Sequence, residues 1–423
     1  MKVLVVGSGG REHAVIRALS KNKSIDEIVC APGNGGIASL AACVNITSTD
    51  VDGMVDYAKN NGVDFCVVTP DDPLALGMVD AMEAAGIPSF GPNKKAAQIE
   101  ASKVFAKGLM KKYGIPTAAY EVFTDPADVL AYLQKRNTWP AVIKADGLAL
   151  GKGVLIAQNE EEAKAAVREL MVDKKFGASG NEVVVEEFME GPEVSVLSFT
   201  DGHVIVPMVS SMDHKRADDG DKGLNTGGMG TIAPSPVYTS EIAKECMEKI
   251  FVPTMHAMNK EGRTFRGVLY FGLMLTKDGP KVVEYNCRFG DPETQVVLPL
   301  LKSDLFTIMR AVHDEKLADL DIEWSDEAAA CIMEASGGYP ESYRKGYEIH
   351  GLDENGQHPG VYVYHSGTKK ENGKFYTNGG RVLGIMATGS DLKEALAKAY
   401  AAVDEIGFEN MHYRHDIGRK VLK

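Results

Sequence analysis

Short apolar runs and amphipathic segments alternate along the first hundred residues. Apolar runs at Val3 to Val6, Ile28 to Cys30 and Phe65 to Val68 predict strands, because each is short and is followed by glycine, proline or polar residues. Helical patterns at 11–20 and 74–85 follow the first and the third of these runs. Strands and helices that alternate at this spacing indicate a parallel, doubly wound sheet and an α/β fold class. Ligands of such sheets bind beyond the carboxyl ends of the strands.

The pattern changes after this region. A lysine-rich helix is predicted over 94–113, and strand and helix signals alternate again from 121 to 186. Further strands and a long glycine-rich loop follow up to about 323. After Ser325 we expect a helix-like segment at 327–330 and strands near 361–365 and 382–387, which together form a small α+β domain.

A chain of 423 residues is too long for a single hydrophobic core. The pattern divides it into an N-terminal Rossmann-like domain, a central core made of two stretches, a small inserted unit and a C-terminal domain. The expected bounds are, in that order, 1–100, 101–120 with 188–325, 121–187, and 326–423.

Composition excludes several classes of protein. A net charge of −13 argues against a general nucleic-acid binder, which needs a basic surface. The six cysteines form no C-x-x-C pair, which is typical of reduced thiols and not of a disulfide frame or a zinc site. No apolar run reaches the ~18 residues of a membrane span, and a strand pattern directly follows Met1 and Lys2. We therefore expect a cytoplasmic protein without a membrane or nucleic-acid partner.

The most informative stretch begins with a predicted strand at Lys281 to Tyr285. Side chains alternate along a strand, so Glu284, Asn286 and Arg288 should share one face. A carboxylate and an amide oxygen suit Mg²⁺, and a guanidinium suits a phosphate or a carboxylate. Three polar residues on an exposed strand would be the simpler interpretation. Two more acids in the loop 289–295 favour a site.

The loop Gly7 to Gly10 after the first strand has two possible meanings. A dinucleotide fingerprint needs a third glycine, but position 12 is Glu. The backbone N–H groups and the following helix N-terminus could instead hold a phosphate, with added charge from Arg11. His13 could line the loop, although a packed or solvated histidine fits equally well.

A second cluster surrounds Lys144. An apolar strand ends at this lysine, and a glycine-rich turn containing Lys152 leads to the next strand at 154–157. Glycines permit close backbone approach and lysines supply point charges, which suits a flap over a polyphosphate. The sequence is not a Walker loop, because no Gly-Lys-Ser/Thr leads into a helix. A glycine-rich hairpin with solvated lysines is the alternative.

Two further clusters are candidates for binding. In the strand and linker 183–193, Phe188 could form an apolar wall for a purine and Glu193 could bind a ribose hydroxyl, although a strand end with solvated acids is as common. The loop 213–230 carries too many glycines and charges to form a core, which favours a functional loop. In it, Asp213 could accept an ammonium group, and Lys215 or Arg216 could bind a phosphate.

The order of these clusters resembles that of ATP-grasp ligases, and more narrowly that of phosphoribosylamine–glycine ligases (glycinamide ribonucleotide synthetases) of purine biosynthesis. The resemblance extends from Val5 to about Asp416. It rests on these strings: Gly9-Gly-Arg-Glu-His-Ala14, Ala31-Pro-Gly-Asn34, Ile143-Lys-Ala-Asp-Gly-Leu-Ala149, Asp213-His-Lys-Arg216, Asn225-Thr-Gly-Gly-Met-Gly230, Asn286-Cys-Arg-Phe-Gly-Asp-Pro-Glu-Thr-Gln295 and Thr377-Asn-Gly-Gly-Arg381.

The resemblance implies an ATP-grasp fold with a preceding Rossmann-like domain, and a role for each matching residue. It implies that ATP is bound by Lys103, Lys144, Lys152, Glu186, Glu187, Phe188 and Glu193. It implies that Mg²⁺ or Mn²⁺ is bound by Glu284 and Asn286. It implies that glycine and 5-phosphoribosylamine are bound by Gly9, Gly10, Arg11, Glu12, Asn34, Asp71, Asp213, Lys215, Gly228, Arg288, Gly290, Asp291, Pro292 and Glu293. Arg288, Lys144 and Asp213 would be catalytic, in a ligation that passes through glycyl phosphate.

The chain departs from the family pattern at two places. Asp71 stands where the family usually has Glu, which shortens its reach by one methylene. The stretch 270–275, before the metal strand, contains no acid, although many ATP-grasp enzymes have one there.

Three other functions are alternatives: a Rossmann oxidoreductase, another ATP-grasp ligase or carboxylase, and a binding protein without activity on the same fold. The broken fingerprint disfavours the first. The Asp213-His-Lys-Arg216 string disfavours the second, and the presence of both Lys144 and Glu284 disfavours the third. We also expect a monomer.

Overall fold

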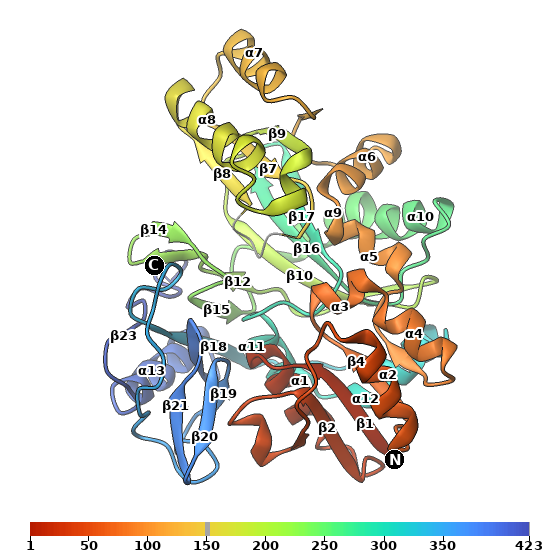
Figure 1. The fold of residues 1–423 in the computed structure, drawn as a ribbon, viewed down its shortest axis with the longest axis vertical. Helices are drawn as coiled ribbons and strands as arrows, with labels where there is room; N and C mark the ends of the chain where they lie inside the picture. The colour runs from red at the N-terminus through yellow and green to blue at the C-terminus, as the bar shows by residue number, and fades with distance from the viewer. Residues whose placement is uncertain (149–152, 423) are drawn as a thin grey trace.

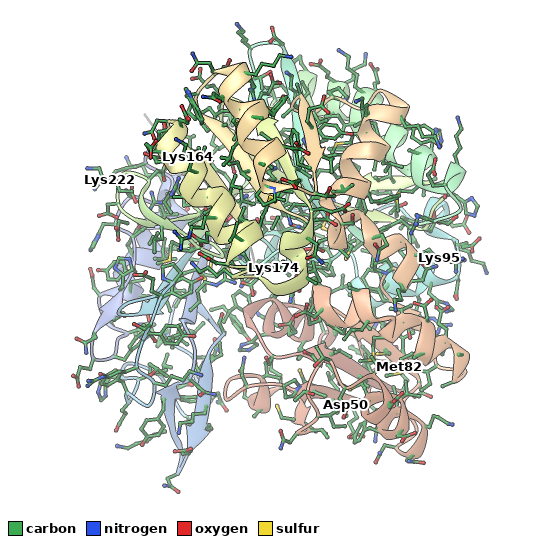
Figure 2. The ribbon with its side chains drawn as sticks, turned by 45° about the horizontal axis from the view of Figure 1, so that its top comes forward. Asp50, Met82, Lys95, Lys164, Lys174 and Lys222 are labelled. Carbon is green, nitrogen blue, oxygen red and sulfur yellow. The ribbon has the colours of Figure 1, made fainter. Side chains whose placement is uncertain are left out.

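A computed structural model of the protein describes residues 1–148 and 153–422. Figure 1 shows the N-terminal domain at the bottom, the small inserted unit at the top and the C-terminal domain beside the N-terminal one. The central strands lie between these parts. Lys164 and Lys174 mark the inserted unit in Figure 2, and Asp50 and Met82 mark the N-terminal domain.

The N-terminal domain contains a five-stranded sheet in the order β3-β2-β1-β4-β5, and all its strand pairs are parallel. The predicted α/β class is confirmed for this region, and the three predicted strands lie within β1, β2 and β4. Its elements are β1 (Lys2–Gly7), α1 (Gly10–Leu19), β2 (Glu27–Pro32), η1 (Ile37–Ser39), β3 (Ala42–Cys43), α2 (Val51–Asn60), β4 (Phe65–Val68), α3 (Asp71–Leu76), α4 (Met78–Ala84), β5 (Ser89–Phe90) and α5 (Lys94–Ala101).

Two predicted helices are each divided in the structure. The helix predicted over 94–113 is interrupted at Ser102, whose hydroxyl accepts a hydrogen bond from the Phe105 amide at 3.0 Å and begins a new helix, α6 (Lys103–Tyr113). The pattern at 74–85 is divided at Gly77, which has φ +95° between α3 and α4. The prediction of a single helix was therefore wrong in both places. It was made because the apolar periodicity continues across each break.

The central region is built on a four-stranded antiparallel sheet in the order β11-β10-β16-β17. Its elements are β10 (Glu193–Thr200), β11 (Ile205–Pro207), β12 (Met212–Asp213), β13 (Arg216–Asp218), β14 (Lys222–Asn225), β15 (Gly230–Ala233), α9 (Ser240–Cys246), η4 (Met247–Phe251), α10 (Val252–Lys260), β16 (Gly267–Thr276), β17 (Gly279–Asn286), α11 (Thr294–Val297), η5 (Leu298–Leu300), α12 (Leu305–His313) and η6 (Leu317–Asp319). Val3 and Val5 of β1 belong to the same buried cluster as Phe199 and Phe289, so the N-terminal sheet packs directly on this region.

The inserted unit has its own antiparallel sheet, β6-β9-β7-β8, and its own small apolar core. Its elements are β6 (Tyr120–Phe123), α7 (Pro126–Arg136), β7 (Ala141–Ala145), β8 (Val154–Ala157), α8 (Glu160–Val167), η2 (Arg168–Val172), η3 (Gly177–Asn181) and β9 (Val183–Glu187).

The C-terminal sheet combines two distant parts of the chain. Its order is β12-β15-β18-β22-β19, and β23 pairs with β18, so two strands that precede residue 326 belong to it. The helix-like segment predicted at 327–330 is wrong, because residues from Ala328 onward form a buried strand between β15 and β22. Its elements are β18 (Ala328–Ser336), β19 (Tyr362–His365), β20 (Thr368–Glu371), β21 (Lys374–Thr377), β22 (Arg381–Gly389), α13 (Leu392–Val403) and β23 (Met411–His412).

The predictions about membrane spans and cysteines can be compared with the structure. Among residues 1–148 and 153–422, no helix combines the length and the apolarity needed to cross a membrane. All six cysteines are free thiols, and Cys43 alone among them is exposed.

Candidate active site

The carboxyl end of β17 carries three of the predicted site residues. Glu284, Asn286 and Arg288 are half-buried, whereas Tyr285 and Cys287 between them are buried. This alternation agrees with the predicted common face of the three polar residues. The strand ends at residue 286, so Arg288 is oriented by the following loop and not by the sheet.

Glu284 lies among lysines from three separate segments. The Lys215 ammonium is 3.3 Å from the Glu284 carboxylate and 3.5 Å from that of Glu193. Lys215, together with Lys144 and Lys103, holds the pKa of Glu284 at about 2 against the opposing effect of burial. In turn, Glu284 raises the pKa of Lys215. The group is therefore a charged cluster that contains an ionised carboxylate.

Lys144 lies near the end of β7 and belongs to a second, more deeply buried cluster. Its ammonium donates a hydrogen bond to the Val283 carbonyl at 3.1 Å and lies 3.0 Å from one oxygen of Glu186. The latter contact is an ion pair without the alignment of a directed hydrogen bond. The other Glu186 oxygen lies 3.1 Å from Lys107. Burial lowers the pKa of Lys107 to about 8, although Glu186 opposes the shift.

Lys103 occupies the first position of α6, directly after the break at Ser102. Its ammonium donates to the Gly147 carbonyl at 2.8 Å. Asp146 accepts hydrogen bonds from the Ser102 hydroxyl at 3.2 Å and from the Val104 amide at 3.0 Å, which fixes the start of the helix. The break therefore places Lys103 beside the glycine-rich turn. Lys152 of the same turn lies outside the described residues.

The remaining residues predicted to bind ATP follow β9. Glu187 accepts a hydrogen bond from the Ala119 amide at 3.1 Å and lies 3.7 Å from Lys281. Phe188 is 39% exposed, which is unusual for a phenylalanine and leaves its ring accessible. Glu193 begins β10 and is exposed apart from its contact with Lys215.

Arg288 is held by a residue that the sequence analysis did not select. Its guanidinium lies 2.9 Å from one oxygen of Glu100, whose other oxygen accepts the Cys287 amide at 2.7 Å. Burial raises the pKa of Glu100, with the Arg288 charge opposing it. The half-buried Asp71 acts electrostatically on both partners. The Arg288 Nε is buried without a partner, so part of its donor fork is unused.

Asp213 at the end of β12 faces the glycine-rich loop. Gly228 has φ +113°, and a Cβ there would lie 2.6 Å from an Asp213 oxygen and 2.5 Å from Pro292, so only glycine fits. Burial and the nearby charge of Glu293 raise the pKa of Asp213. Glu293 accepts a hydrogen bond from the Tyr270 hydroxyl at 3.0 Å. Among the described residues, no cation lies within ion-pair distance of the half-buried Asp213, and the charges of Lys215 and Arg381 act on it from further away.

The start of α1 brings most of the predicted N-terminal site residues together. Glu12 accepts the Gly9 amide at 2.5 Å, and its other oxygen lies 2.6 Å from Arg11. Arg11 also donates to the Phe289 carbonyl at 3.2 Å. A Cβ on Gly10 would lie 2.6 Å from the Ser366 hydroxyl, so the loop runs close to the C-terminal domain.

Asn34 has a different environment from the one predicted for a substrate contact. Its amide group donates to the carbonyls of Ser8 and His365, each at 2.8 Å, and its oxygen accepts the Gly36 and Ile37 amides at 2.9 and 3.0 Å. Its polar atoms are thus engaged by backbone from both the N-terminal and the C-terminal domain.

Asp291 connects the β17 loop to the C-terminal domain through Arg381. The Arg381 guanidinium lies 3.2 Å from the Asp291 carboxylate and donates to its carbonyl at 2.9 Å and to that of Gly227 at 2.8 Å. Arg381 and Arg11 lower the pKa of Asp291 against the effect of burial. A Cβ on Gly290 would lie 2.4 Å from a Glu293 oxygen, so a larger residue there would displace the Glu293 side chain.

Comparison with known families assigns most of the chain. Three sequence profiles described as phosphoribosylglycinamide synthetase match it: the N domain over residues 1–100, the ATP-grasp (A) domain over 101–294 and the C domain over 329–420. A phosphoribosylamine–glycine ligase of Caldanaerobacter subterraneus subsp. tengcongensis is 49% identical over 418 residues, covering 99% of each chain. The chain belongs to the phosphoribosylglycinamide synthetase family. The phosphoribosylamine–glycine ligase of Clostridium acetobutylicum is 48% identical, over 99% of this chain and 100% of its own.

Solved structures support the fold assignment. The crystal structure of a phosphoribosylamine–glycine ligase from Thermotoga maritima has a TM-score of 0.86 at 34% identity and covers 98% of this chain and 100% of its own. Biotin carboxylase from Campylobacter jejuni has a TM-score of 0.75 at 13% identity, over 97% of this chain and 92% of its own, a likeness that shows the fold alone. The predicted ATP-grasp fold and the predicted ligase class are therefore confirmed, and the oxidoreductase alternative is discarded.

The family's nucleotide chemistry raises the question of a metal ion. Within residues 1–148 and 153–422, no cluster of three or more His, Cys, Asp or Glu side chains could enclose one. Glu284 and Asn286 supply a carboxylate and an amide oxygen on one strand end. Mg²⁺ is commonly held by one or two protein oxygens and by the phosphates of the substrate. The residues thus fit an ion shared with ATP and do not fit an all-protein cage.

Sequence reasoning missed four members of the site. Glu100 and Lys107 are on helices α5 and α6, and Tyr270 is on β16; their side chains meet the predicted residues only in the folded chain. Arg381 ends a string that carries the family resemblance, so that string was the available signal for it.

Proposed function

We propose that the protein catalyses the ATP-dependent ligation of glycine to 5-phosphoribosylamine, giving glycinamide ribonucleotide, ADP and phosphate. The observation that carries the proposal is the charged cluster at Glu284, whose carboxylate lies 3.3 Å from Lys215 and is also held ionised by the charges of Lys144 and Lys103. It occurs in a chain that matches named ligases over 99% of its length. Such a cluster suits a phosphoryl transfer, which depends on positioning and charge neutralisation.

ATP lies between the inserted unit and the central sheet in this proposal. Lys103, Lys144 and Lys152 neutralise its phosphates. Glu186, Glu187, Phe188 and Glu193 surround the adenosine. The exposed Phe188 ring and the exposed Glu193 carboxylate are available for a base and a ribose.

Glu284 and Asn286 would hold a Mg²⁺ or Mn²⁺ ion together with the ATP phosphates. When bound, the ion supplies positive charge to the transferring phosphoryl group. The low pKa of Glu284 keeps its carboxylate ionised at neutral pH. Lys215, which pairs with Glu284 in this structure, can then turn to the phosphate.

Glycine binds between Asp213 and Arg288 in this proposal. The glycine ammonium would pair directly with the half-buried Asp213 carboxylate, on which Lys215 and Arg381 act only from a distance. The glycine carboxylate attacks the γ-phosphorus of ATP, the bond to the β-phosphate oxygen breaks and ADP leaves. Arg288 neutralises the charge that develops on the transferring group, using donors not occupied by Glu100.

Phosphoribosylamine binds at the loops that begin α1. The Gly9 and Gly10 loop and Arg11 take its phosphate, with Glu12, Asn34, Asp71, Gly228, Gly290, Asp291, Pro292 and Glu293 around the sugar and the amine. The amine attacks the carbonyl carbon of glycyl phosphate, the C–O bond to phosphate breaks, and the amine loses a proton. The result is an amide and free phosphate. Asn34 contributes by joining the two loops that border this region.

Phosphate release from Mg·ATP tests the proposal, with glycine and freshly generated phosphoribosylamine each supplied or left out. Release that requires both substrates is expected. Release with another carboxylate and amine, and not with this pair, would keep the fold and remove the substrate assignment.

A cytoplasmic location and a monomeric state remain predictions. The six free cysteines are consistent with a reducing compartment. Fractionation of cells that express the protein tests the location, and light scattering at micromolar concentration tests the monomer.

A further inference from the structure

The last residues of the chain lie against the loop that carries Asp213 and Lys215. This loop, residues 213–230, contains the β13–β14 hairpin, and the C-terminal segment 412–420 runs beside it. Figure 1 shows β14 next to the marked C-terminus, and Figure 2 shows Lys222 at the outer edge of the molecule on the same side. None of the roles proposed above uses residues 412–420.

Arg414 is the centre of this contact. It is 1% exposed and is the largest fully buried side chain of the described chain. Its guanidinium lies 2.8 Å from Asp416 and 2.9 Å from Asp221, and it donates to the Arg216 carbonyl at 3.2 Å. One cation therefore connects its own segment to β13 and to the turn of the hairpin.

Further hydrogen bonds follow the same boundary. Asp416 accepts the Gly220 amide at 2.8 Å, and Asp219 accepts the His415 amide at 2.8 Å. Lys420 pairs with Asp221. The hairpin turn is thus bound to the C-terminal segment through the Gly220 amide and through the carboxylates of Asp219 and Asp221.

His214 extends the contact to the base of the loop. This buried side chain lies between Asp213 and Lys215 in the sequence. Its Nδ1 donates to the Gly230 carbonyl at 3.1 Å, and its Nε2 accepts the Gly418 amide at 3.0 Å. A Cβ on Gly230 would lie 2.8 Å from Ile417, so the packing there is tight.

The loop 213–230 contacts the charged cluster at Glu284 through Lys215. The Lys215 carbonyl accepts the Thr226 amide at 2.7 Å and the Thr226 hydroxyl at 2.8 Å, which closes the loop at its base. The Lys215 ammonium then reaches Glu284 at 3.3 Å. Any shift of the hairpin is therefore transmitted to Lys215 and to the Gly228 turn that faces Asp213.

We propose that the C-terminal segment 412–420 is a positioning element for the loop 213–230, and that Arg414 is its principal positioning residue. The segment fixes the loop so that Asp213 and Lys215 meet glycine and the phosphoryl group in one arrangement. The catalytic consequence rests on the proposed function, whereas the bracing itself is a property of the free protein.

The first test compares Arg414→Met with Arg419→Met, which removes the same charge from an exposed site in the same segment. Hydrogen exchange of the full-length protein, followed by mass spectrometry, should show amides of 214–226 exchanging about tenfold faster in Arg414→Met. Peptides from 1–100 should not change. Exchange in 214–226 equal to that of Arg419→Met would overturn the proposal.

The second test separates positioning from stability. In Arg414→Met, kcat/KM for glycine should fall on the order of 10- to 100-fold, because a small misplacement of a reacting group is costly. The affinity for ADP alone should stay within about twofold, since it depends on other elements. Arg414→Lys, which keeps the charge without the fork of donors, should restore only part of the activity. A lowered Tm with unchanged kcat/KM below the transition would show a merely structural role and overturn the proposal.

A milder variant covers the case in which Arg414→Met does not fold. Asp221→Asn removes a partner of both Arg414 and Lys420 at a site near the surface. The faster exchange of amides in 214–226 and the fall in kcat/KM for glycine should each be about a third to a tenth as large as in Arg414→Met. If the wild-type protein shows no turnover with glycine and phosphoribosylamine, the proposed function fails, while the exchange experiment still decides whether the segment braces the loop.

Discussion

Glu186 and Glu284 both lie among lysines, but their surroundings differ in access to solvent. Glu186 is 2% exposed, and its two oxygens lie 3.1 Å from Lys107 and 3.0 Å from Lys144. The Glu284 side chain is 33% exposed, and among the described residues it has one lysine contact, at 3.3 Å from Lys215. The first carboxylate is thus enclosed, whereas the second can exchange its partner.

This difference suggests two roles for the same residue type. A buried carboxylate between two ammonium groups cannot lose a partner without leaving an uncompensated charge, so Glu186 is suited to orienting Lys144. An accessible carboxylate with a low pKa is suited to binding an incoming cation, as proposed for Glu284. Substitutions at the two sites should therefore separate stability from turnover.

The largest effect is expected for Glu284→Gln. Turnover should fall by on the order of 10³-fold or more, because charge neutralisation at the phosphoryl group is the main source of catalysis. The free energy of unfolding should change by about 1 kcal/mol or less, since the lost pair is partly solvated. Phosphate release and urea unfolding measure the two quantities.

Glu248→Gln is the matched control, because its carboxylate is exposed and lies 3.9 Å from Lys244. It should leave both quantities unchanged. Activity of Glu284→Gln equal to that of this control would remove the metal assignment.

Glu186→Gln should lower the free energy of unfolding far more than Glu284→Gln does. It leaves Lys107 and Lys144 buried without a counter-charge, which should lower the free energy of unfolding by about 3–5 kcal/mol. The exposed Glu190→Gln nearby should have no such effect. Chemical denaturation followed by circular dichroism measures the stability of Glu186→Gln and Glu190→Gln. Equal stability of the two variants would show that Glu186 is not needed to neutralise Lys107 and Lys144.

A smaller effect on turnover is expected for Glu100→Gln. The variant keeps an acceptor for the Cys287 amide and weakens the ion pair that orients Arg288. We expect kcat to fall about 10- to 100-fold with an unchanged KM for ATP. Steady-state kinetics with saturating glycine decide this, and a rise in the KM for ATP alone would place Arg288 at the nucleotide instead.

The smallest effect concerns acid stability. The pKa of Glu284 is about 2 in the folded state, against an ordinary value of 4.5. Its ionised form therefore stabilises the fold above about pH 4.5, and this contribution is lost as the pH falls towards 2. The stability difference between the wild type and Glu284→Gln, about 1 kcal/mol at most, should shrink over that window. Urea midpoints from pH 3 to 7 measure it; a difference that grows on acidification would contradict the low pKa.

Local patterns predicted the parts of the fold in which propensity and environment agree. The N-terminal strands and the β17 strand are apolar runs with clear ends, and the structure contains them. The segment at 327–330 was predicted as helix-like. Pairing with β15 and β22 makes it a strand, since strand formation depends on neighbours that the local sequence does not reveal.

The site residues also differ in whether the local sequence reveals them. Lys144 could be selected because it ends an apolar run before a glycine-rich turn, and Glu284 because it alternates with Asn286 and Arg288. Glu100 and Lys107 could not, because their significance comes from contacts with residues 188 and 79 positions away in the chain. Asn34 was selected from a motif, but its side chain is engaged by backbone from two domains, which only the folded structure reveals.

The central claim is that glycine is activated as an acyl phosphate at the Glu284 cluster. Glycine labelled with ¹⁸O in its carboxylate tests this directly, with the released phosphate examined by mass spectrometry. The account predicts one ¹⁸O atom in each phosphate, because a carboxylate oxygen bridges to phosphorus before the amine displaces it. Phosphate free of ¹⁸O, released at the same rate as the amide forms, would contradict it.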